Sequence, residues 1–567
     1  MPSLTGRSER FLRKKPRTLR RSLATIFFAL LVLTQAWPQP ATPVLVRVDA
    51  AKSEGPYAPI WNYFGADEPN YTYAPHGLKL LRELSALSPV PVYFRTHNLL
   101  TTGDGTASLK WGSTNVYREA PDGSPIYDWT ITDRIFDAFQ AAHIRPLVEV
   151  GFMPEALSSH PEPYRHTFPQ GDIFTGWSYP PRDYAKWSVL VRAWVYHLRQ
   201  RYDTTAWLWE VWNEPDIPYW HGTPEEYEKL YDVTAAAIRS ELPDAKVGGP
   251  ESTGPANEHA AAFLRHFLEH CAHGVNAATG KSGAPLDFIS FHPKGNPKFS
   301  QGHVRMNIGA QLSAVERGME IVASYPEWRN TPIILGESDP EGCAACKGEQ
   351  NGYRNGPLYG VSIVEAIART YELARKENVH IQGAVTWAFE FEDQPYFAGF
   401  RQLATNGIDL AVLNVFRMLG MLRGDWVETT CTGAQPLDDV VNNSVTALPD
   451  VDAIATRDGR EIDVLVWNYH DDDVPAEPAS IHLEITHLGA KRVRTEMFRM
   501  DADHSNAFTL WKSMDRPQKP TPAQRVQLEE SAALQRDPGR ALAVHHTVAT
   551  LDFSLPRQGV YLVKLMW

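Results

Sequence analysis

Eight short apolar runs alternate with segments of helical periodicity between residues 60 and 386, and this alternation limits the possible folds more than any other feature of the chain. Two parallel strands can be neighbours only if a long crossover, usually a helix, connects them. Eight strand-and-helix units in succession are typical of a (β/α)8 barrel, the TIM-barrel fold. The predicted strands are 60–64, 92–95, 146–150, 207–211, 246–249, 287–290, 333–336 and 381–386.

Helical spacing of apolar residues separates these runs and continues beyond the last of them. The predicted helices are 76–87, 130–142, 184–202, 225–242, 258–270, 311–324 and 360–377, and an apolar stretch follows at 411–422.

The pattern changes after about residue 424, where short alternating runs separated by Pro and polar clusters predict an accessory antiparallel β-sandwich. A second domain is expected because 567 residues exceed the size of one hydrophobic core. We assign 60–424 to the barrel and 425–567 to the sandwich, and expect 37–59 to join the sandwich. The sandwich runs are 462–469, 481–486, 493–500, 547–553 and 560–566, with 501–540 as a long ordered excursion.

The N-terminus has the layout of a secretory signal peptide, assigned to residues 1–36. The first 21 residues hold eight Lys/Arg and one acid, an apolar run covers 23–33, and Thr34-Gln35-Ala36 offers a cleavage site. The protein is therefore expected in the periplasm or outside the cell. An uncleaved anchor is the alternative, although about 11 apolar residues fall short of the roughly 20 that span a bilayer. Arg20-Arg21 also fits a twin-arginine export signal.

Charge excludes some classes of partner. Without residues 1–36 the chain keeps 47 basic and 66 acidic residues, a net charge near −19. Such a chain repels nucleic acid and anionic membrane surfaces, so neither is an expected partner, and no stable membrane insertion is expected after signal cleavage. The sequence leaves the oligomeric state open.

Four cysteines, an even number, permit two disulfides in an exported protein: Cys271, Cys343, Cys346 and Cys431. The close pair, Cys343 and Cys346, lies in a Gly-rich loop. A redox pair would begin a helix beside a thioredoxin-like sheet, and a four-Cys zinc site would need a second close pair. We therefore predict a local disulfide clip that stiffens this loop.

Two glutamates end predicted strands. The strand at 207–211 runs into Trp212-Asn213-Glu214-Pro215, and the strand at 333–336 runs into Glu337, 123 residues after Glu214. Barrel enzymes place their chemistry at the carboxyl ends of the strands, and most sugar-cleaving mechanisms need two carboxylates. One acid after an apolar run is unremarkable in a chain with 67 acidic residues, but two at the ends of different strands favour a catalytic pair.

With these motifs in order, the chain resembles glycoside hydrolase family 39, the retaining enzymes that include β-xylosidases and α-L-iduronidase. The likeness runs over nearly the whole chain after the signal. Besides the two glutamate motifs, it rests on Tyr93-Phe94-Arg95-Thr96-His97, Pro146-Leu147-Val148-Glu149-Val150-Gly151-Phe152-Met153-Pro154, Val247-Gly248-Gly249-Pro250, Asp287-Phe288-Ile289-Ser290-Phe291-His292 and Thr386-Trp387.

The resemblance implies that Glu214 is the acid/base and Glu337 the nucleophile, and that Asn213 binds the sugar 2-hydroxyl. A retaining mechanism needs one protonated and one ionised carboxyl about 5 to 5.5 Å apart. His97 and His292 follow strands and are expected to bind hydroxyls or orient a carboxylate.

Two further residues follow the last predicted strand. Trp387 is expected to form a stacking floor for the sugar. Glu392, in the acidic run Phe389-Glu390-Phe391-Glu392-Asp393, is expected to bind sugar hydroxyls or to support its loop.

Two loops depart from the common family pattern, which leaves the sugar less certain than the reaction. His292-Pro293-Lys294 lacks the aromatic residue that many relatives have two positions after the histidine. The segment after the nucleophile, Ser338-Asp339-Pro340-Glu341-Gly342, is also unusual, and its Glu341 is a rival nucleophile.

The expected function is that of an exo-acting retaining glycosidase that removes a pentose or small pentose unit from plant-wall oligosaccharides, most closely a β-xylosidase. An arabinosyl-releasing enzyme is one alternative within the family. An α-L-iduronidase is another, with Lys294 or Arg354 meeting the uronate. A catalytically silent saccharide-binding protein is the alternative outside the enzyme class. No metal or organic cofactor is expected, because the sequence has no closely spaced His/Asp ligand cluster and no phosphate-binding Gly loop.

Overall fold

A computed structural model describes residues 42–567 of the chain. The predicted signal peptide and the first residues of the 37–59 segment lie outside this part. Within the described residues, no helix combines the length and the apolar character needed to cross a membrane.

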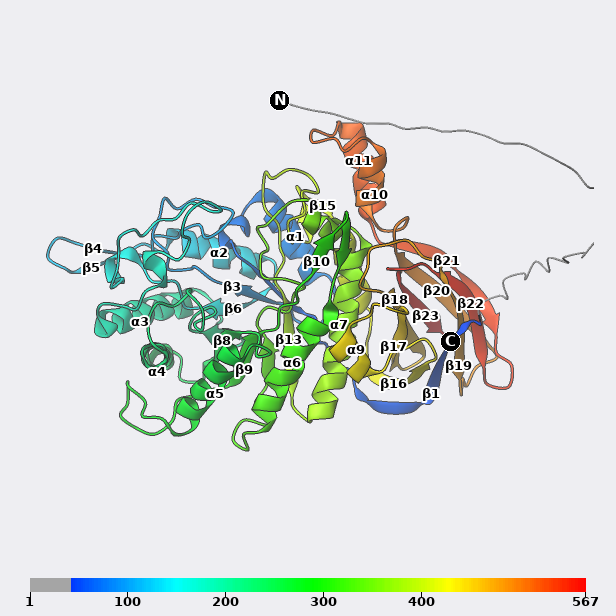
Figure 1. The fold of residues 1–567 in the computed structure, drawn as a ribbon, viewed down its shortest axis with the longest axis horizontal. Coiled ribbons are helices and arrows are strands. Elements are labelled where there is room, and N and C mark those ends of the chain that lie inside the picture. Colours follow the sequence, from blue (N-terminus) through cyan, green and yellow to red (C-terminus); the bar gives the residue numbers. More distant parts are fainter. Residues whose placement is uncertain (1–41) are drawn as a thin grey trace, which may run out of the picture. The chain divides into compact units, whose positions relative to one another are not determined.

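Eight parallel strands close into a barrel, which confirms the predicted fold class (Figure 1). Each predicted strand overlaps an observed one. The barrel strands are β2 (Tyr63–Ala66), β3 (Tyr93–Thr96), β6 (Arg145–Glu149), β7 (Leu208–Glu210), β8 (Lys246–Thr253), β9 (Phe288–His292), β12 (Ile333–Leu335) and β13 (Ile381–Thr386), with β13 pairing with β2 to close the ring.

Seven of the barrel helices overlap the seven predicted helices, and the eighth lies in the apolar stretch at 411–422. The barrel helices are α1 (Pro75–Ser85), α2 (Thr130–Ala141), α3 (Tyr184–Arg201), α4 (Pro224–Glu241), α5 (Glu258–His273), α6 (Ile308–Ala323), α7 (Pro357–Glu377) and α8 (Ala411–Leu419). The start of α4 shows how local sequence sets such a boundary. Thr223 accepts a hydrogen bond from the backbone N–H of Glu226, whose side chain accepts from the N–H of Thr223, and Pro224 fits the first turn.

The barrel strands are buried on both faces, as parallel strands in α/β proteins are. All five residues of β9 are buried, and so are four of the five in β6. Their apolar side chains belong to one core that also includes the inner faces of the helices. This packing fixes the carboxyl ends of the strands, where the candidate catalytic residues lie.

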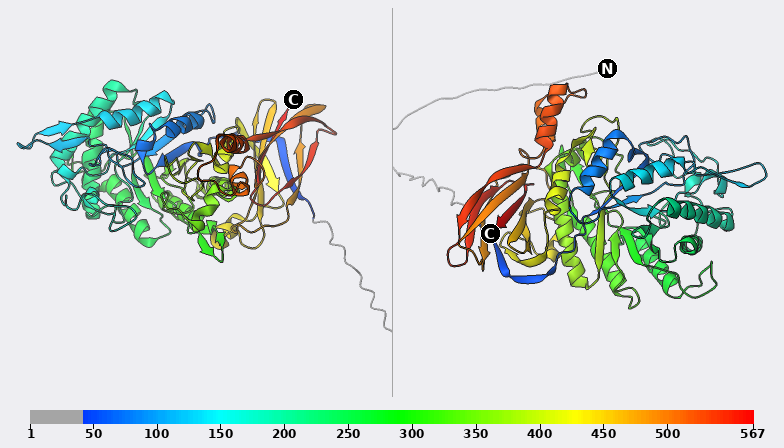
Figure 2. Two further views of the ribbon diagram at one scale, coloured as in Figure 1. Left: turned by 90° about the horizontal axis from the view of Figure 1, so that it is seen from above. Right: turned by 180° about the vertical axis from the view of Figure 1, so that it is seen from behind.

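A second sheet of nine strands follows the barrel, in the order β21-β20-β23-β18-β17-β16-β1-β19-β22. Figure 2 shows its strands from two further sides. Its strands are β1 (Val44–Pro56), β16 (Asp425–Cys431), β17 (Asp450–Asp458), β18 (Glu461–Tyr469), β19 (Ala479–Thr486), β20 (Arg492–Met500), β21 (Gln535–Ala543), β22 (Ala549–Leu555) and β23 (Val560–Met566). Apolar side chains from β1, β19 and β22 share a core with those from β18, β20 and β23. The separate β-domain is therefore confirmed.

The sheet is mostly rather than wholly antiparallel. Strand β1 pairs antiparallel with β16 but parallel with β19. Strands that are joined by tight turns must run antiparallel, whereas the whole barrel separates β1 from β19, so no turn fixes their relative direction.

The excursion at 501–540 contains α10 (Ala507–Ser513) and α11 (Pro522–Ala532) before β21 begins. Arg525 of α11 donates a hydrogen bond to the carbonyl of Asn406, at 3.0 Å. Asn406 lies between the short strands β14 (Ala404–Thr405) and β15 (Ile408–Asp409). The excursion therefore supports a hairpin of the barrel domain.

A buried ion cluster joins the barrel to the second sheet. Arg369 of α7 contacts Glu365 on its own helix, at 2.9 Å, and Asp450 at the start of β17. Glu365 also accepts a hydrogen bond from the indole N–H of Trp467 on β18, at 2.6 Å. The guanidinium therefore neutralises acids from both domains.

Replacing Arg369 with Met should destabilise the protein by about 3–5 kcal/mol, because Glu365 and Asp450 would stay buried without their cation. Urea unfolding followed by tryptophan fluorescence measures this change. Lys376→Met on the same helix is the control, since Lys376 forms exposed pairs with Glu316 and Asp438, and exposed pairs contribute about 1 kcal/mol or less. Equal effects of the two substitutions on the free energy of unfolding would contradict the role of Arg369 as the cation that compensates the buried acids.

Candidate active site

Glu214 and Glu337 lie beyond the carboxyl ends of β7 and β12. The backbone of Glu214 has a φ of 44°, in the left-handed region that residues other than glycine rarely adopt. Its N–H donates a hydrogen bond to the carbonyl of Glu251, at 2.8 Å. Strained backbone of this kind persists where the surrounding structure enforces it, and it is concentrated at functional sites.

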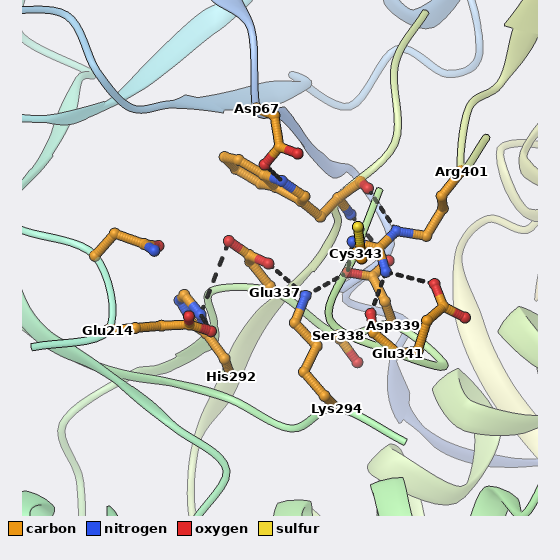
Figure 3. A network of polar contacts seen from close by, with 12 residues as sticks. Asp67, Glu214, His292, Lys294, Glu337, Ser338, Asp339, Glu341, Cys343 and Arg401 are labelled. Atoms are coloured by element: carbon orange, nitrogen blue, oxygen red, sulfur yellow. Dashed lines mark hydrogen bonds and ion pairs between the residues drawn. The ribbon is translucent and has the colours of Figure 1, made fainter. Parts of the chain in front are cut away.

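The carboxyl groups of Glu214 and Glu337 both approach the same side of the His292 ring (Figure 3). The ring Nδ1 lies 3.0 Å from Glu214 Oε1 and 3.8 Å from Glu337 Oε1. One side-chain ligand atom from each of the three residues lies within 4.8 Å of the other two. An oxygen–oxygen approach within this limit is compatible with the 5 to 5.5 Å carboxyl separation of retaining glycosidases and leaves less room than the 6.5 to 9.5 Å of inverting ones.

Basic groups surround Glu337 on several sides. Lys294 Nζ contacts its Oε2, and Arg95 Nη1 donates to its Oε1 at 3.1 Å. Burial by itself would raise the pKa of the Glu337 carboxyl, but the charges of Lys294, His292 and Arg95 outweigh burial and hold that pKa well below its usual range. Glu337 is therefore ionised at neutral pH.

Arg95 is the centre of the buried charge network. It lies on β3 with no exposed surface, and its guanidinium contacts Glu149, Glu210 and Glu337 and lies 3.5 Å from Glu251. These acids come from four other parts of the barrel. Burial raises the pKa values of Glu149 and Glu210 well above their usual range, despite the opposing charge of Arg95.

His292 links this network to Glu214. Its Nε2 lies 2.6 Å from Glu251 Oε2, on the opposite side of the ring from Glu214. Burial lowers the pKa of the imidazole, but the charge of Glu337 and the hydrogen bonds to Glu214 and Glu251 raise it to about 9. His292 is thus a cation that can donate a hydrogen bond to a carboxyl group on each side, to Glu214 from Nδ1 and to Glu251 from Nε2.

Three of the other predicted site residues lie around this centre. Asn213 Oδ1 accepts a hydrogen bond from Arg95 Nη2, at 3.1 Å, and no described residue accepts from the Asn213 amide. Trp387 donates its indole N–H to Asp67, at 2.8 Å, and its ring lies 4.9 Å from the Arg95 guanidinium. The His97 ring packs 4.7 Å from Trp387. Sugar contacts of these side chains stay predictions.

Glu392 does not join this group. Its Oε1 lies 3.2 Å from His76 Nδ1 on α1, in a separate cluster described below.

The loop after β12 is held by arginines and by the predicted clip. Cys343 and Cys346 form a disulfide, and Arg354 donates hydrogen bonds to the carbonyls of both, at 2.9 and 2.8 Å. Arg354 also pairs with Glu341, at 2.6 Å, as does Arg401 at 2.8 Å. These contacts assign Glu341 and Arg354 to the structure of the loop.

The second disulfide that four cysteines permit is absent from the described residues. Cys271 on α5 and Cys431 on β16 are both free. Cys271 is packed in the barrel core, whereas Cys431 packs against the separate core of the second sheet, so the fold keeps them apart.

Sequence reasoning missed several residues of the site. Arg95 and Glu149 lie in motifs that carry the family resemblance, but the motifs do not indicate their role, and no motif marks Glu251. Asp339 accepts from the backbone N–H of Trp387, at 3.1 Å, and pairs with Lys294 at 2.9 Å. The sequence did give one indication of the role of Arg95. An arginine within the apolar strand 92–95 is expected to be buried, and a buried arginine needs acidic partners.

A cavity of about 300 Å³ adjoins the site on the side of the loop after β3. Aromatic and polar side chains line it together, including Trp111, His166 and Phe168. Lys110, which also lines it, lies 3.7 Å from Asp67, the partner of Trp387. The cavity is therefore a candidate pocket for part of a saccharide.

The model of the family described as glycosyl hydrolases family 39 matches residues 44–548. The chain belongs to this family. It is therefore a glycoside hydrolase that acts on carbohydrate, and the resemblance seen in the sequence is confirmed.

Similar proteins carry two different activities in their names. A β-xylosidase from Caldicellulosiruptor saccharolyticus is 26% identical over 466 residues, covering 78% of this chain and 84% of its own. An α-L-iduronidase from Mus musculus is 24% identical over 544 residues, covering 88% and 77%. The crystal structure of a monomeric β-xylosidase from Caulobacter crescentus CB15 matches with a TM-score of 0.72 at 22% identity, over 92% of this chain and 99% of that one. This last likeness shows the fold.

The raised pKa of His292 predicts a pH-dependent stability. The imidazole should titrate near pH 9 in the folded protein and near 6.5 when unfolded. Its contribution should therefore be complete below about pH 6.5 and should disappear as pH rises through about 9. Urea unfolding from pH 6 to 9.5 measures the effect, with His292→Gln as the comparison. If the stability difference between parent and variant does not shrink over this range, His292 is not held as a cation.

Proposed function

We propose that this protein hydrolyses glycosides with retention of anomeric configuration, with Glu337 as the nucleophile and Glu214 as the acid/base. The observation that carries this proposal is the unequal environment of two neighbouring carboxyls. Lys294, Arg95 and His292 stabilise the charge of Glu337. Among the described residues, His292 is the only basic side chain in contact with Glu214, which retains 13% exposure at its side chain.

The reaction takes two displacements. In the first, a Glu337 oxygen bonds to the anomeric carbon while the glycosidic bond breaks, and the protonated Glu214 transfers its proton to the leaving oxygen. In the second, Glu214 takes a proton from a water molecule whose oxygen attacks the anomeric carbon, which releases the sugar and Glu337. The free amide N–H of Asn213 is available to the sugar 2-hydroxyl, where a hydrogen bond that strengthens in the transition state would raise the rate.

Our first candidate substrate is a terminal pentoside of the β-xyloside type, released from the end of a plant-wall oligosaccharide by the exported enzyme. The β-xylosidase relatives support this assignment. The adjoining cavity supports it too, because aromatic faces with nearby polar groups suit the leaving part of an oligosaccharide. No contact separately favours an arabinosyl substrate.

Lys294 favours a second candidate, an α-L-iduronide. Its ammonium contacts Glu337 and Asp339, and its side chain is 15% exposed. A sugar bound next to Glu337 would therefore lie close to a positive charge, which suits the carboxylate of a uronic acid. Arg354 gives no such support, because its guanidinium is occupied by the disulfide loop and Glu341.

Substitution of the two glutamates tests the mechanism. Glu337→Gln should lower kcat on an aryl glycoside by about 10⁴-fold or more, because the nucleophile is lost. Glu214→Gln should lower it by about 10²- to 10⁴-fold, and least for aryl leaving groups that need little protonation. Glu341→Gln is the matched control and should keep more activity than Glu337→Gln. Proton NMR of the first-formed sugar anomer reports retention or inversion, and inversion would contradict double displacement.

Lys294→Gln tests how the charge of Glu337 is maintained. Removing the ammonium should raise the pKa of Glu337, so the acid limb of the pH profile of kcat/KM should move to higher pH. Lys298→Gln on the exposed strand β10 (Lys298–Ser300) is the control. An acid limb that stays in place would show that Lys294 does not govern Glu337.

The same variant separates the two sugars. If a uronate binds Lys294, the KM for an aryl α-L-iduronide should rise by about 10-fold or more, because a charge-assisted hydrogen bond is lost. The KM for an aryl β-xyloside should change little. Turnover of the xyloside alone would support the first candidate.

A further inference from the structure

A second cluster of ligand-type side chains lies away from the catalytic pair. His76 is in the first turn of α1, and Glu390 and Glu392 follow β13. His76 Nδ1 lies 3.2 Å from Glu392 Oε1 and 4.0 Å from Glu390 Oε1. One ligand atom from each of the three residues lies within 4.8 Å of the other two.

Local sequence places both acids on one side of their segment. Residues two apart in an extended chain point the same way. Phe389 and Phe391 accordingly pack in the core, while the intervening Glu390 and the following Glu392 meet His76.

The cluster contains buried polar atoms without hydrogen-bond partners. Glu390 has no side-chain exposure. Its Oε1 accepts from the Gly407 N–H, at 2.7 Å, but its Oε2 has no partner in the described part of the chain. Glu392 Oε2 also has no partner there, and His76 Nδ1 has only the 3.2 Å approach to Glu392 Oε1, which does not form a hydrogen bond. Burial of unpaired carboxylates is costly unless a cation or a proton compensates them.

No nearby base supplies that compensation by contact. Lys79, one turn further along α1, lies 2.9 Å from Glu83 and 2.8 Å from Asp409, and is committed to these two acids. The cluster therefore combines the fully buried carboxyl of Glu390, the carboxyl of Glu392 with 13% side-chain exposure and a partly exposed imidazole, and no Lys or Arg contacts it among the residues described.

We propose that His76, Glu390 and Glu392 bind a first-row divalent metal ion of the Zn²⁺ type. Ca²⁺ and Mg²⁺ prefer oxygen ligands throughout, whereas an imidazole with carboxylates suits Zn²⁺ and its neighbours. Ligand atoms around tetrahedral Zn²⁺ lie roughly 3.3 Å apart, since each bond is about 2.0–2.1 Å. The 3.2 Å between His76 Nδ1 and Glu392 Oε1 already matches this spacing.

Neighbouring contacts orient the three side chains of the cluster. The hydrogen bond from Gly407 fixes one oxygen of Glu390 and leaves the other for a metal. Such second contacts hold ligands in place at metal sites. The ion would connect α1, the segment after β13 and the turn between β14 and β15. The segment after β13 begins with Trp387, so the ion would anchor one side of the catalytic rim.

Glu214, His292 and Glu337 also bring three ligand atoms within 4.8 Å of one another, but the positive charges around them repel a cation. Arg95 and Lys294 both contact Glu337, and His292 is itself charged. Binding measurements are therefore made in Glu214→Gln protein, which removes one ligand of the catalytic trio.

Calorimetric titration of EDTA-treated Glu214→Gln protein with Zn²⁺ tests the proposal. We expect about one equivalent to bind, and both His76→Gln and Glu390→Gln to weaken binding by about 10-fold or more. Co²⁺ in place of Zn²⁺ should give visible absorption bands that both substitutions abolish. Zn²⁺ should also raise the thermal unfolding midpoint of the parent by mass action, but not that of the variants.

Glu83→Gln is the matched control, because Glu83 is an acid of the same helix outside the trio, and it should leave Zn²⁺ affinity unchanged. Should Glu390→Gln fail to fold, His76→Gln and Glu392→Gln provide the same comparison. Failure of the protein to bind Zn²⁺, or binding that survives these substitutions, would overturn the proposal and indicate that a shared proton compensates Glu390 and Glu392.

Discussion

The contact on which the active site depends most is that of one fully buried guanidinium, Arg95, with the acids around it. Charge in a barrel interior is stable only when it is paired and hydrogen-bonded. Arg95 meets this requirement for Glu337 and also contacts Glu149 and Glu210, whose pKa values burial nevertheless keeps raised. Each acid comes from a different strand or its end, so the ion pairs also fix how those strand ends lie relative to one another.

The same network makes two neighbouring glutamates chemically different. Arg95 and Lys294 contact Glu337, whereas His292 contacts Glu214, which is partly exposed to solvent. A double-displacement mechanism needs this difference, with one ionised nucleophile and one group that gives and takes a proton. The charges around the two glutamates are therefore the reason why we propose Glu337 as the nucleophile and Glu214 as the acid/base.

Rigid support extends outward from Glu337. Lys294 also pairs with Asp339, which lies 3.5 Å from Arg401. Arg401 in turn pairs with Glu341, in the loop that the disulfide closes. The unusual segment after the nucleophile therefore forms a continuous set of ion pairs, and its departure from the common family pattern has a structural reason.

Local sequence alone determined the barrel, the presence of a β-domain and the two candidate glutamates. Apolar runs, helix periodicity and strand-end motifs are short-range features, so Glu214 and Glu337 could be selected without coordinates. The Cys343–Cys346 clip could be predicted for the same reason, because its two residues are close in the chain.

Tertiary structure decided which distant side chains share a charge network. Glu251, which contacts His292, carries no motif that marks it. No local pattern shows that Glu392, expected to bind sugar hydroxyls or to support its loop, contacts His76. The parallel pairing of β1 with β19 was equally hidden. In each case the partners are far apart in the sequence, and only closure of the barrel and its packing against the second sheet bring them together. The sequence therefore determined the elements and the two candidate carboxyls, while the fold decided which side chains contact these carboxyls and hence their electrostatic environment.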